Sequence, residues 1–151
     1  MAKTQKYILK ELLVSLEKSI QLPQCLKIMG YLTRMRVFNN DQLLLRKEFL
    51  SRRLKYLESL LPKQPVDAPS SSDAYDHLAK FMDLHRMHIF AIVTQYKAIF
   101  VDIESESDGA GRSLTEDLLV IWVHRRVINI VGTIEKLLPF VSSGSLKDLF
   151  R

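Results

Sequence analysis

The chain of 151 residues has little of what would place it in several common classes of protein. It contains one cysteine, Cys25, so it forms no intrachain disulfide and suits a reducing compartment. Its longest apolar run, from Leu118 to Val123, is far below the roughly 18 residues that a membrane-spanning helix needs. Charged residues from Lys3 to Lys18 interrupt the N-terminus, so no secretory signal peptide is predicted. From these absences we expect a soluble, cytosolic protein.

Glycine and proline, at five residues each, are also scarce, and they cluster between long patterned stretches. This distribution favours long helices over a protein built from strands and turns. The hydrophobic share of 47% and the charged share of 26% are close to the globular average, so a packed core is expected. Because no stretch alternates as a strand would and no internal repeat occurs, the predicted fold class is all-α.

Apolar residues recur at helical spacing over five segments, and prolines or capping residues lie between them. The predicted helices run from about Thr4 to Gln21, from Pro23 to about Arg36, from the cap at Asn39–Asp41 to Leu61, from Leu78 to Ile103, and from a capping box at Ser113 and Glu116 to about Leu138. They should form one elongated bundle over residues 1–151, with mobile loops near 62–72 and 104–112. The chain ends on an apolar turn, so we expect a fragment of a longer subunit.

Two of these segments carry especially regular apolar stripes. In the fourth, steps of four and three residues join Leu78, Met82, His85, Ile89, Ile92, Tyr96, Ile99 and Ile103. This heptad pattern predicts a buried seam, and a second flank of Phe81, Phe90, Val93 and Phe100 predicts packing on two sides. In the fifth segment the predicted stripe is Val120, Val123, Val127, Ile130, Ile134 and Leu137, and it is widened by Leu118, Ile121, Trp122 and Ile128.

Patterns that would indicate catalysis or metal binding are incomplete. His85 and His88 lie one helical turn apart, but no third ligand or accompanying glutamate is evident, so both are interpreted as structural. The glycines before Ser113 lack the spacing of a phosphate-binding loop, and Cys25 is best explained as a small buried apolar residue. We therefore predict no catalytic, cofactor-binding or metal-binding residues, no cofactor, and no enzymatic activity.

The net charge of +5 is unevenly distributed. Basic residues dominate from Lys27 to Lys63, whereas Asp102–Asp108 is acidic. A basic region of this kind permits contact with anionic lipid or nucleic acid, so a peripheral membrane or nucleic-acid-binding helical module is the alternative function. The simpler explanation is a solvated helix face, because no nucleic-acid-binding module accompanies the charge.

Two blocks of sequence carry a family resemblance. The first comprises Leu22–Pro23, Cys25–Leu26, Gly30–Leu32, Arg34–Met35, Val37–Phe38, Leu43, Phe49–Leu50, Arg53 and Leu57; the second comprises His88–Phe90 and Thr94–Phe100. In order and separation they resemble the N-terminal half of the Dor1-like family, subunit 8 of the conserved oligomeric Golgi complex. The resemblance covers roughly residues 8 to 138.

The resemblance implies a helical rod of the kind found in multisubunit tethering complexes. It implies a structural subunit that acts in intra-Golgi retrograde transport and in maintaining glycosylation, at the cytoplasmic face of the Golgi membrane and in the cytosol. The implied partners are subunit 1 and the lobe of subunits 5, 6 and 7, with SNARE and Rab proteins reached through the complex. Nucleic acid is not implied, and membrane contact would be peripheral at most.

One surface is singled out for partner binding. The first predicted helix lies at the edge of the sequence, where longer family members continue into further helix. Its apolar side chains Leu9, Leu13, Leu16 and Ile20 fall on one face and form the candidate partner-binding stripe.

Overall fold

The computed structural model describes residues 2–36, 38–39, 41–63, 70–101 and 110–141, with the side chains of 110–116 left undescribed. The helices are α1 (Lys3–Ser15), α2 (Leu22–Arg34), α3 (Gln42–Leu60), α4 (Ser71–Tyr96) and α5 (Ala110–Leu137), together with the π-helical turn η1 (Lys97–Val101) and the 3₁₀ turn η3 (Leu138–Phe140). No strand occurs in these ranges, so the prediction of an all-α bundle is confirmed.

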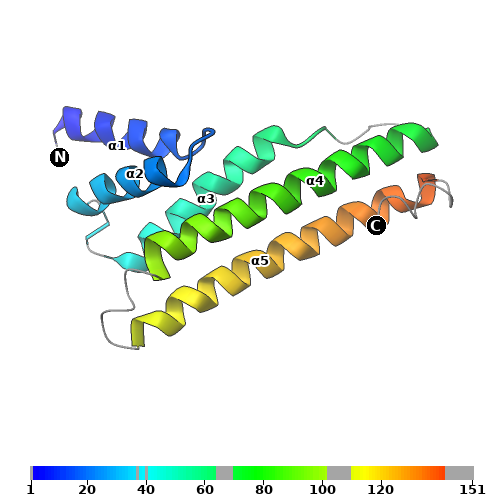
Figure 1. Ribbon diagram of the computed structural model, residues 1–151. Coiled ribbons are helices and arrows are strands. Elements are labelled where there is room, and N and C mark those ends of the chain that lie inside the picture. The colour runs from blue at the N-terminus through cyan, green and yellow to red at the C-terminus, as the bar shows by residue number, and fades with distance from the viewer. Residues whose placement is uncertain (1, 37, 40, 64–69, 102–109, 142–151) are drawn as a thin grey trace.

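The helices form an elongated bundle with a short hairpin beside one end (Figure 1). Helices α3, α4 and α5 run along the long axis, each reversing the direction of the one before. Helices α1 and α2 form an antiparallel pair next to the first half of α3. Helix α5 lies at the edge of the bundle, with α4 between much of it and the rest of the chain.

Helix α1 ends earlier than the sequence predicted. The prediction extended to Gln21, but the helix ends at Ser15 and the chain turns before Leu22 begins α2. The guanidinium of Arg53 on α3 explains this end: its Nη1 donates to the carbonyl oxygens of Leu16 and Lys18, at 2.9 and 2.7 Å. These carbonyls then have a partner outside their own helix, so the backbone can leave the helical path without losing hydrogen bonds.

Capping side chains define the starts of two helices. Asp41 Oδ1 accepts hydrogen bonds from the backbone N–H groups of Leu43 and Leu44, at 3.0 and 3.2 Å, which confirms the predicted cap of α3. Ser70 Oγ accepts from the backbone N–H of Asp73 at 3.1 Å and caps α4. The last residues of the predicted loop at 62–72 are therefore helical, while 64–69 lie outside the described residues.

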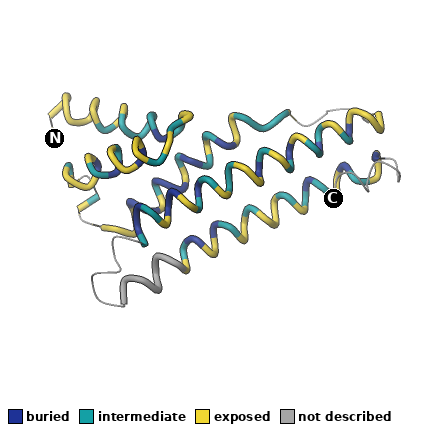
Figure 2. Tube along the Cα trace, in the orientation of Figure 1, coloured by how far each residue is buried: buried dark blue, intermediate teal, exposed yellow. Residues whose placement is uncertain are grey.

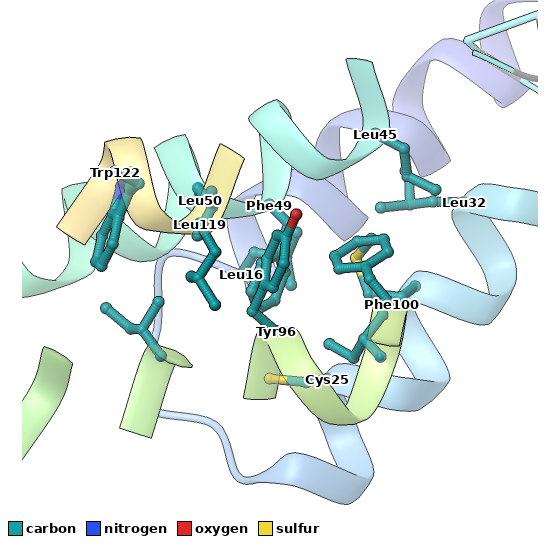
Figure 3. Packing of buried hydrophobic residues seen from close by; sticks show 13 residues of the cluster. Leu16, Cys25, Leu32, Leu45, Phe49, Leu50, Tyr96, Phe100, Leu119 and Trp122 are labelled. Carbon is teal, nitrogen blue, oxygen red and sulfur yellow. The ribbon is translucent and has the colours of Figure 1, made fainter. Parts of the chain in front are cut away.

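The main core lies where the hairpin meets the bundle, and it centres on Phe49 of α3 (Figure 3). The Phe49 ring packs edge-on against Phe100 at 5.8 Å between centroids and tilted against Tyr96 at 6.4 Å. Leu16 and Cys25 bring the hairpin into the same cluster. A second, smaller cluster of Ala74, Leu78, Leu137 and Val141 closes the far end of the bundle.

The predicted seam of α4 is largely confirmed. Its buried members are Leu78, His85, Ile92, Tyr96 and Ile99; Met82 and Ile89 are partly buried, and Ile103 lies outside the described residues. The second flank is only partly correct, since Phe81 and Phe100 are buried but Phe90 is 74% exposed. The π-helical turn η1 places Ile99 and Phe100 together in the core, because its wider turn shifts the side-chain register.

The predicted stripe of α5 is partly wrong. Leu137 is buried and Val123, Ile130 and Ile134 are partly buried, but Val120 and Val127 are 66% and 49% exposed. Leu119 and Thr133, which the stripe did not include, face inward with Trp122 and Leu137. Figure 2 shows buried positions alternating with exposed ones along α5. The helix also begins at Ala110, so Ser113 lies inside it and is not its cap.

Candidate interaction surfaces

The predicted partner-binding stripe of α1 faces the core of this chain. Leu16 is fully buried, and Leu9, Leu13 and Ile20 pack against the main cluster while partly exposed. The opposite side of the helix exposes Tyr7, at 65%. The stripe therefore attaches α1 to the bundle, and its role in contacting another protein stays a prediction.

Charged groups reinforce the attachment of the hairpin to α3. Arg52 donates from Nη1 to Glu17 at 2.7 Å and from Nε to Glu48 at 2.6 Å, and the Lys55 ammonium lies 3.5 Å from Glu17. Partial burial would raise the pKa of Glu17, but the hydrogen bond from Arg52 and the charge of Lys55 outweigh it and lower that pKa. Arg53, next in sequence, is buried, and this burial lowers its pKa.

The basic region from Lys27 to Lys63 does not present its charges on one surface. Arg46 and Arg53 are buried, and Arg52 and Lys55 are paired with Glu17. Of the five closely spaced cations of α3, all but Lys47 are therefore buried or ion-paired within the chain. This weakens the case for a lipid-binding or nucleic-acid-binding surface on α3.

The two histidines of the incomplete metal pattern have separate structural contacts. His85 is buried, donates from Nδ1 to the Phe81 carbonyl at 2.8 Å, and packs on the Phe81 ring. His88 lies edge-on to the Tyr56 ring at 5.5 Å. Burial is the main cause that lowers the pKa of both. In the described ranges, no three histidine, cysteine or acidic side chains gather as a metal site would require.

Cys25 is fully buried in the main cluster, and burial raises the pKa of its thiol. A thiol of this kind is mostly protonated at neutral pH and is shielded from solution, so it is not suited to act as a nucleophile.

An open apolar surface, which the sequence analysis missed, runs between α4 and α5. One hollow of about 570 Å³ is lined mainly by valines 93, 101, 120, 123 and 127. A second, of about 480 Å³, is lined by Met82, Ile89, Phe90 and Ile130 among others, and it meets the first at Val93. Contiguous exposed apolar surface of this kind is a candidate interaction site.

A smaller groove of about 420 Å³ lies between α3 and α5. Its apolar lining comes from Leu50, Leu54, Leu118, Ile121 and Trp122. Its charged lining residues are Lys47, Arg125 and Arg126. No sequence pattern predicted this groove, because the arginine pair of α5 lies far along the chain from the basic region of α3.

The whole chain, residues 1–151, matches the model of the Dor1-like family. The chain belongs to the Dor1-like family.

Curated relatives of this Dor1-like chain are each named conserved oligomeric Golgi complex subunit 8. The protein of Drosophila melanogaster is 34% identical over 137 residues, covering 85% of this chain and 23% of its own length. The human protein is 41% identical over 99 residues, covering 66% and 15%. The Bos taurus protein is 33% identical over 135 residues, covering 87% and 20%.

The Dor1-like chain thus spans less than a quarter of the length of these relatives. No solved structure matches it. Among its described helices, none combines the length and the apolar character needed to cross a membrane.

Proposed function

We propose that this chain is a structural, non-catalytic part of a Golgi vesicle-tethering complex, the conserved oligomeric Golgi complex. The observation that carries the proposal is the match of all 151 residues to the Dor1-like family, whose curated members are named subunit 8 of that complex. Acting at the cytoplasmic face of the Golgi membrane, the chain would take part in intra-Golgi retrograde transport and thereby help to keep glycosylation enzymes in place.

The form of the molecule supports a role in assembly. Long helices are self-supporting rods that extend by about 1.5 Å per residue. The open apolar surface between α4 and α5 includes Phe90 and Val120, at 74% and 66% exposed, and burying such side chains against another helix would be favourable. Proposed partners are subunit 1 and the lobe of subunits 5, 6 and 7, with SNARE and Rab proteins bound through the complex.

The test is reconstitution from purified parts. The 151-residue chain is mixed with purified subunits 1, 5, 6 and 7, singly and together, and complexes are separated by size-exclusion chromatography. We expect stoichiometric co-elution with at least one of them. Failure to co-elute with any subunit or combination, by a chain whose circular dichroism shows it to be helical, would contradict the proposal.

The stripe of α1 remains part of this proposal. Because Leu16 is fully buried, charging it would disturb the fold, whereas Leu9 is partly exposed near the start of the helix. If the stripe contacts a partner, Leu9→Asp should weaken co-elution at a temperature where circular dichroism shows the variant still folded, although the lost packing of Leu9 on the main cluster should lower its melting temperature. Tyr7→Asp, on the exposed side of the same helix, is the matched control. Equal binding by both variants would remove the stripe from the interface.

A further inference from the structure

The groove between α3 and α5 combines an apolar floor with charge of one sign. Leu50, Leu54 and Ile121 supply apolar surface, and Lys47, Arg125 and Arg126 are the charged residues that line it in the described part of the chain. No acidic side chain lines the groove there. A binding segment would therefore need apolar side chains together with negative charge.

Two buried donors in the lining of this groove lack acceptors within the described residues. The indole Nε1–H of Trp122 and the Nε–H of Arg126 are both buried and make no hydrogen bond there. The Trp122 side chain is 9% exposed, and the Arg126 guanidinium stacks over its ring at 6.0 Å. Buried polar groups in native proteins are nearly always hydrogen-bonded, so these two donors, which are shielded from solvent, carry an energetic cost in the chain by itself.

The helix that carries these groups is apolar on almost every side. Besides its buried side, α5 exposes Val120, Ile121, Val127, Ile128 and Val131. A helix that is apolar all round is typical of a position surrounded by other helices, yet α5 lies at the edge of the bundle (Figure 1). Its neighbours within the chain cover only part of its surface.

We propose that the α3–α5 groove binds an amphipathic helix of another subunit of the complex, one that carries an aspartate or glutamate on its apolar side. The carboxylate would lie among Lys47, Arg125 and Arg126, while flanking apolar side chains contact Leu54 and Ile121. A groove bounded by two helices fits a third helix laid along it. This inference rests on the proposed function, which supplies the partner subunits.

The positive charge of the groove favours an acidic helix over a second copy of this chain as the occupant. A twofold dimer through this groove would use the same patch on both copies and bring the three cations of one against those of the other. An acidic partner helix neutralises them instead. Binding of anionic lipid to the same cations is the competing outcome that the experiment distinguishes.

The test uses the full chain with purified subunits 1, 5, 6 and 7, and it reverses two exposed charges of the groove with Lys47→Glu and Arg125→Glu. The control, Lys27→Glu with Lys80→Glu, makes the same change of net charge at exposed positions that do not line the groove. We expect the groove variant to bind the partner at least tenfold more weakly, and the control to stay within about twofold of the parent. Circular dichroism and melting temperature should match among all three chains.

A photo-crosslinking residue at the exposed, groove-lining Ser51 identifies what lies in the groove. We expect a crosslink to one helical segment with an acidic residue, and we expect reversal of that residue to lysine to restore binding to the groove variant. The same crosslinker at the exposed Met87 of α4 is the control and should not label this segment.

Three results would overturn the inference. The first is equal binding by the groove and control variants, which leaves the proposed function intact if the parent still assembles. The second is the absence of a Ser51 crosslink to any partner subunit. The third is binding to vesicles of phosphatidylserine and phosphatidylcholine that the groove variant alone loses, with no loss of subunit binding. Failure of the parent chain to bind any subunit would overturn both this inference and the proposed function.

Discussion

Single buried polar side chains determine how the hairpin and the bundle of this protein meet. Arg53 is 3% exposed, and its guanidinium joins α3 to the turn that follows α1 through the carbonyls of Leu16 and Lys18. A charged group this deeply buried is stabilising only while its hydrogen bonds are made. The contribution of such a residue is therefore best measured by a substitution that removes the charge and the hydrogen-bond donors but keeps a side chain of similar length.

We expect Arg53→Met to lower the free energy of unfolding by about 2–4 kcal/mol, because two carbonyl groups would lose a donor and that of Leu16 would remain buried. Urea denaturation followed by circular dichroism measures the change. Lys47→Met on the same helix removes a charge from an exposed side chain and should stay within about 0.5 kcal/mol. A similar loss in both variants would show that the hydrogen bonds of Arg53 do not hold the turn.

The buried His85 should make stability depend on pH. Burial lowers its pKa in the folded state below the ordinary value of 6.5, so the unfolded chain binds more protons just below that pH. The free energy of unfolding should therefore fall as the pH drops below about 6.5, with the neutral form favoured above it. His77 and His88 share this direction, since burial also lowers their pKa values.

His85→Gln removes one of these titrating groups and should reduce the loss of stability between pH 7.5 and pH 5.5. The control is His124→Gln, at an exposed position on α5, and it should retain the pH dependence of the parent. Urea denaturation at the two pH values gives both comparisons. An unchanged difference in His85→Gln would mean that this residue does not contribute to the acid sensitivity.

At the scale of elements, one helix can present both a core seam and a surface for partners. In α4, Ile92 is 1% exposed within the seam, whereas Phe90 is 74% exposed beside the apolar hollows shared with α5. These two positions are two residues apart and thus point in nearly opposite directions on a helix. They allow the seam and the surface to be tested with the same substitution.

Ile92→Asp should lower the free energy of unfolding by several kcal/mol, about 3–5, because it places an unpaired charge in apolar surroundings. Phe90→Asp should change stability by about 0.5 kcal/mol or less, since its side chain is already in water. Thermal melting by circular dichroism distinguishes the two. If Ile92→Asp melts like the parent, the seam of α4 is not the core of the fold.

At the scale of the whole molecule, the main cluster joins the hairpin to all three long helices. Phe49 contributes a fully buried ring that packs on Tyr96 and Phe100, while Leu16 and Cys25 reach the same cluster from the hairpin side. The smaller cluster around Leu78 lies at the opposite end, where its described members belong to α4, α5 and the chain just after α5.

Phe49→Ala should therefore cost about 3–5 kcal/mol and weaken hydrogen-exchange protection in the hairpin as well as in the bundle. Leu78→Ala should lower the free energy of unfolding by a similar amount, about 2–5 kcal/mol. It should leave the hydrogen-exchange protection of α1 and α2 closer to that of the parent. Equal loss of protection in the hairpin in both variants would indicate one indivisible folding unit.

Several features follow from the sequence because their causes are local. The existence of five helices follows from periodic apolar residues, and the start of α3 follows from the carboxylate of Asp41, which reaches only the next turn. The seam of α4 could be predicted for the same reason, since its apolar side chains repeat without interruption over more than three heptads.

Other features were decided only in the tertiary structure. Helix α1 stops at Ser15 because Arg53, 37 positions beyond Leu16, takes up the carbonyl groups released by the turn. The orientation of α5 could not be predicted from periodicity, because a helix that is apolar nearly all round has no unique inward face, and contacts with α3 and α4 selected Leu119 and Trp122. The same contacts left valines exposed and placed Lys47, Arg125 and Arg126 around one groove. Residues so far apart in the chain are joined by packing alone, so no local pattern could have revealed that groove.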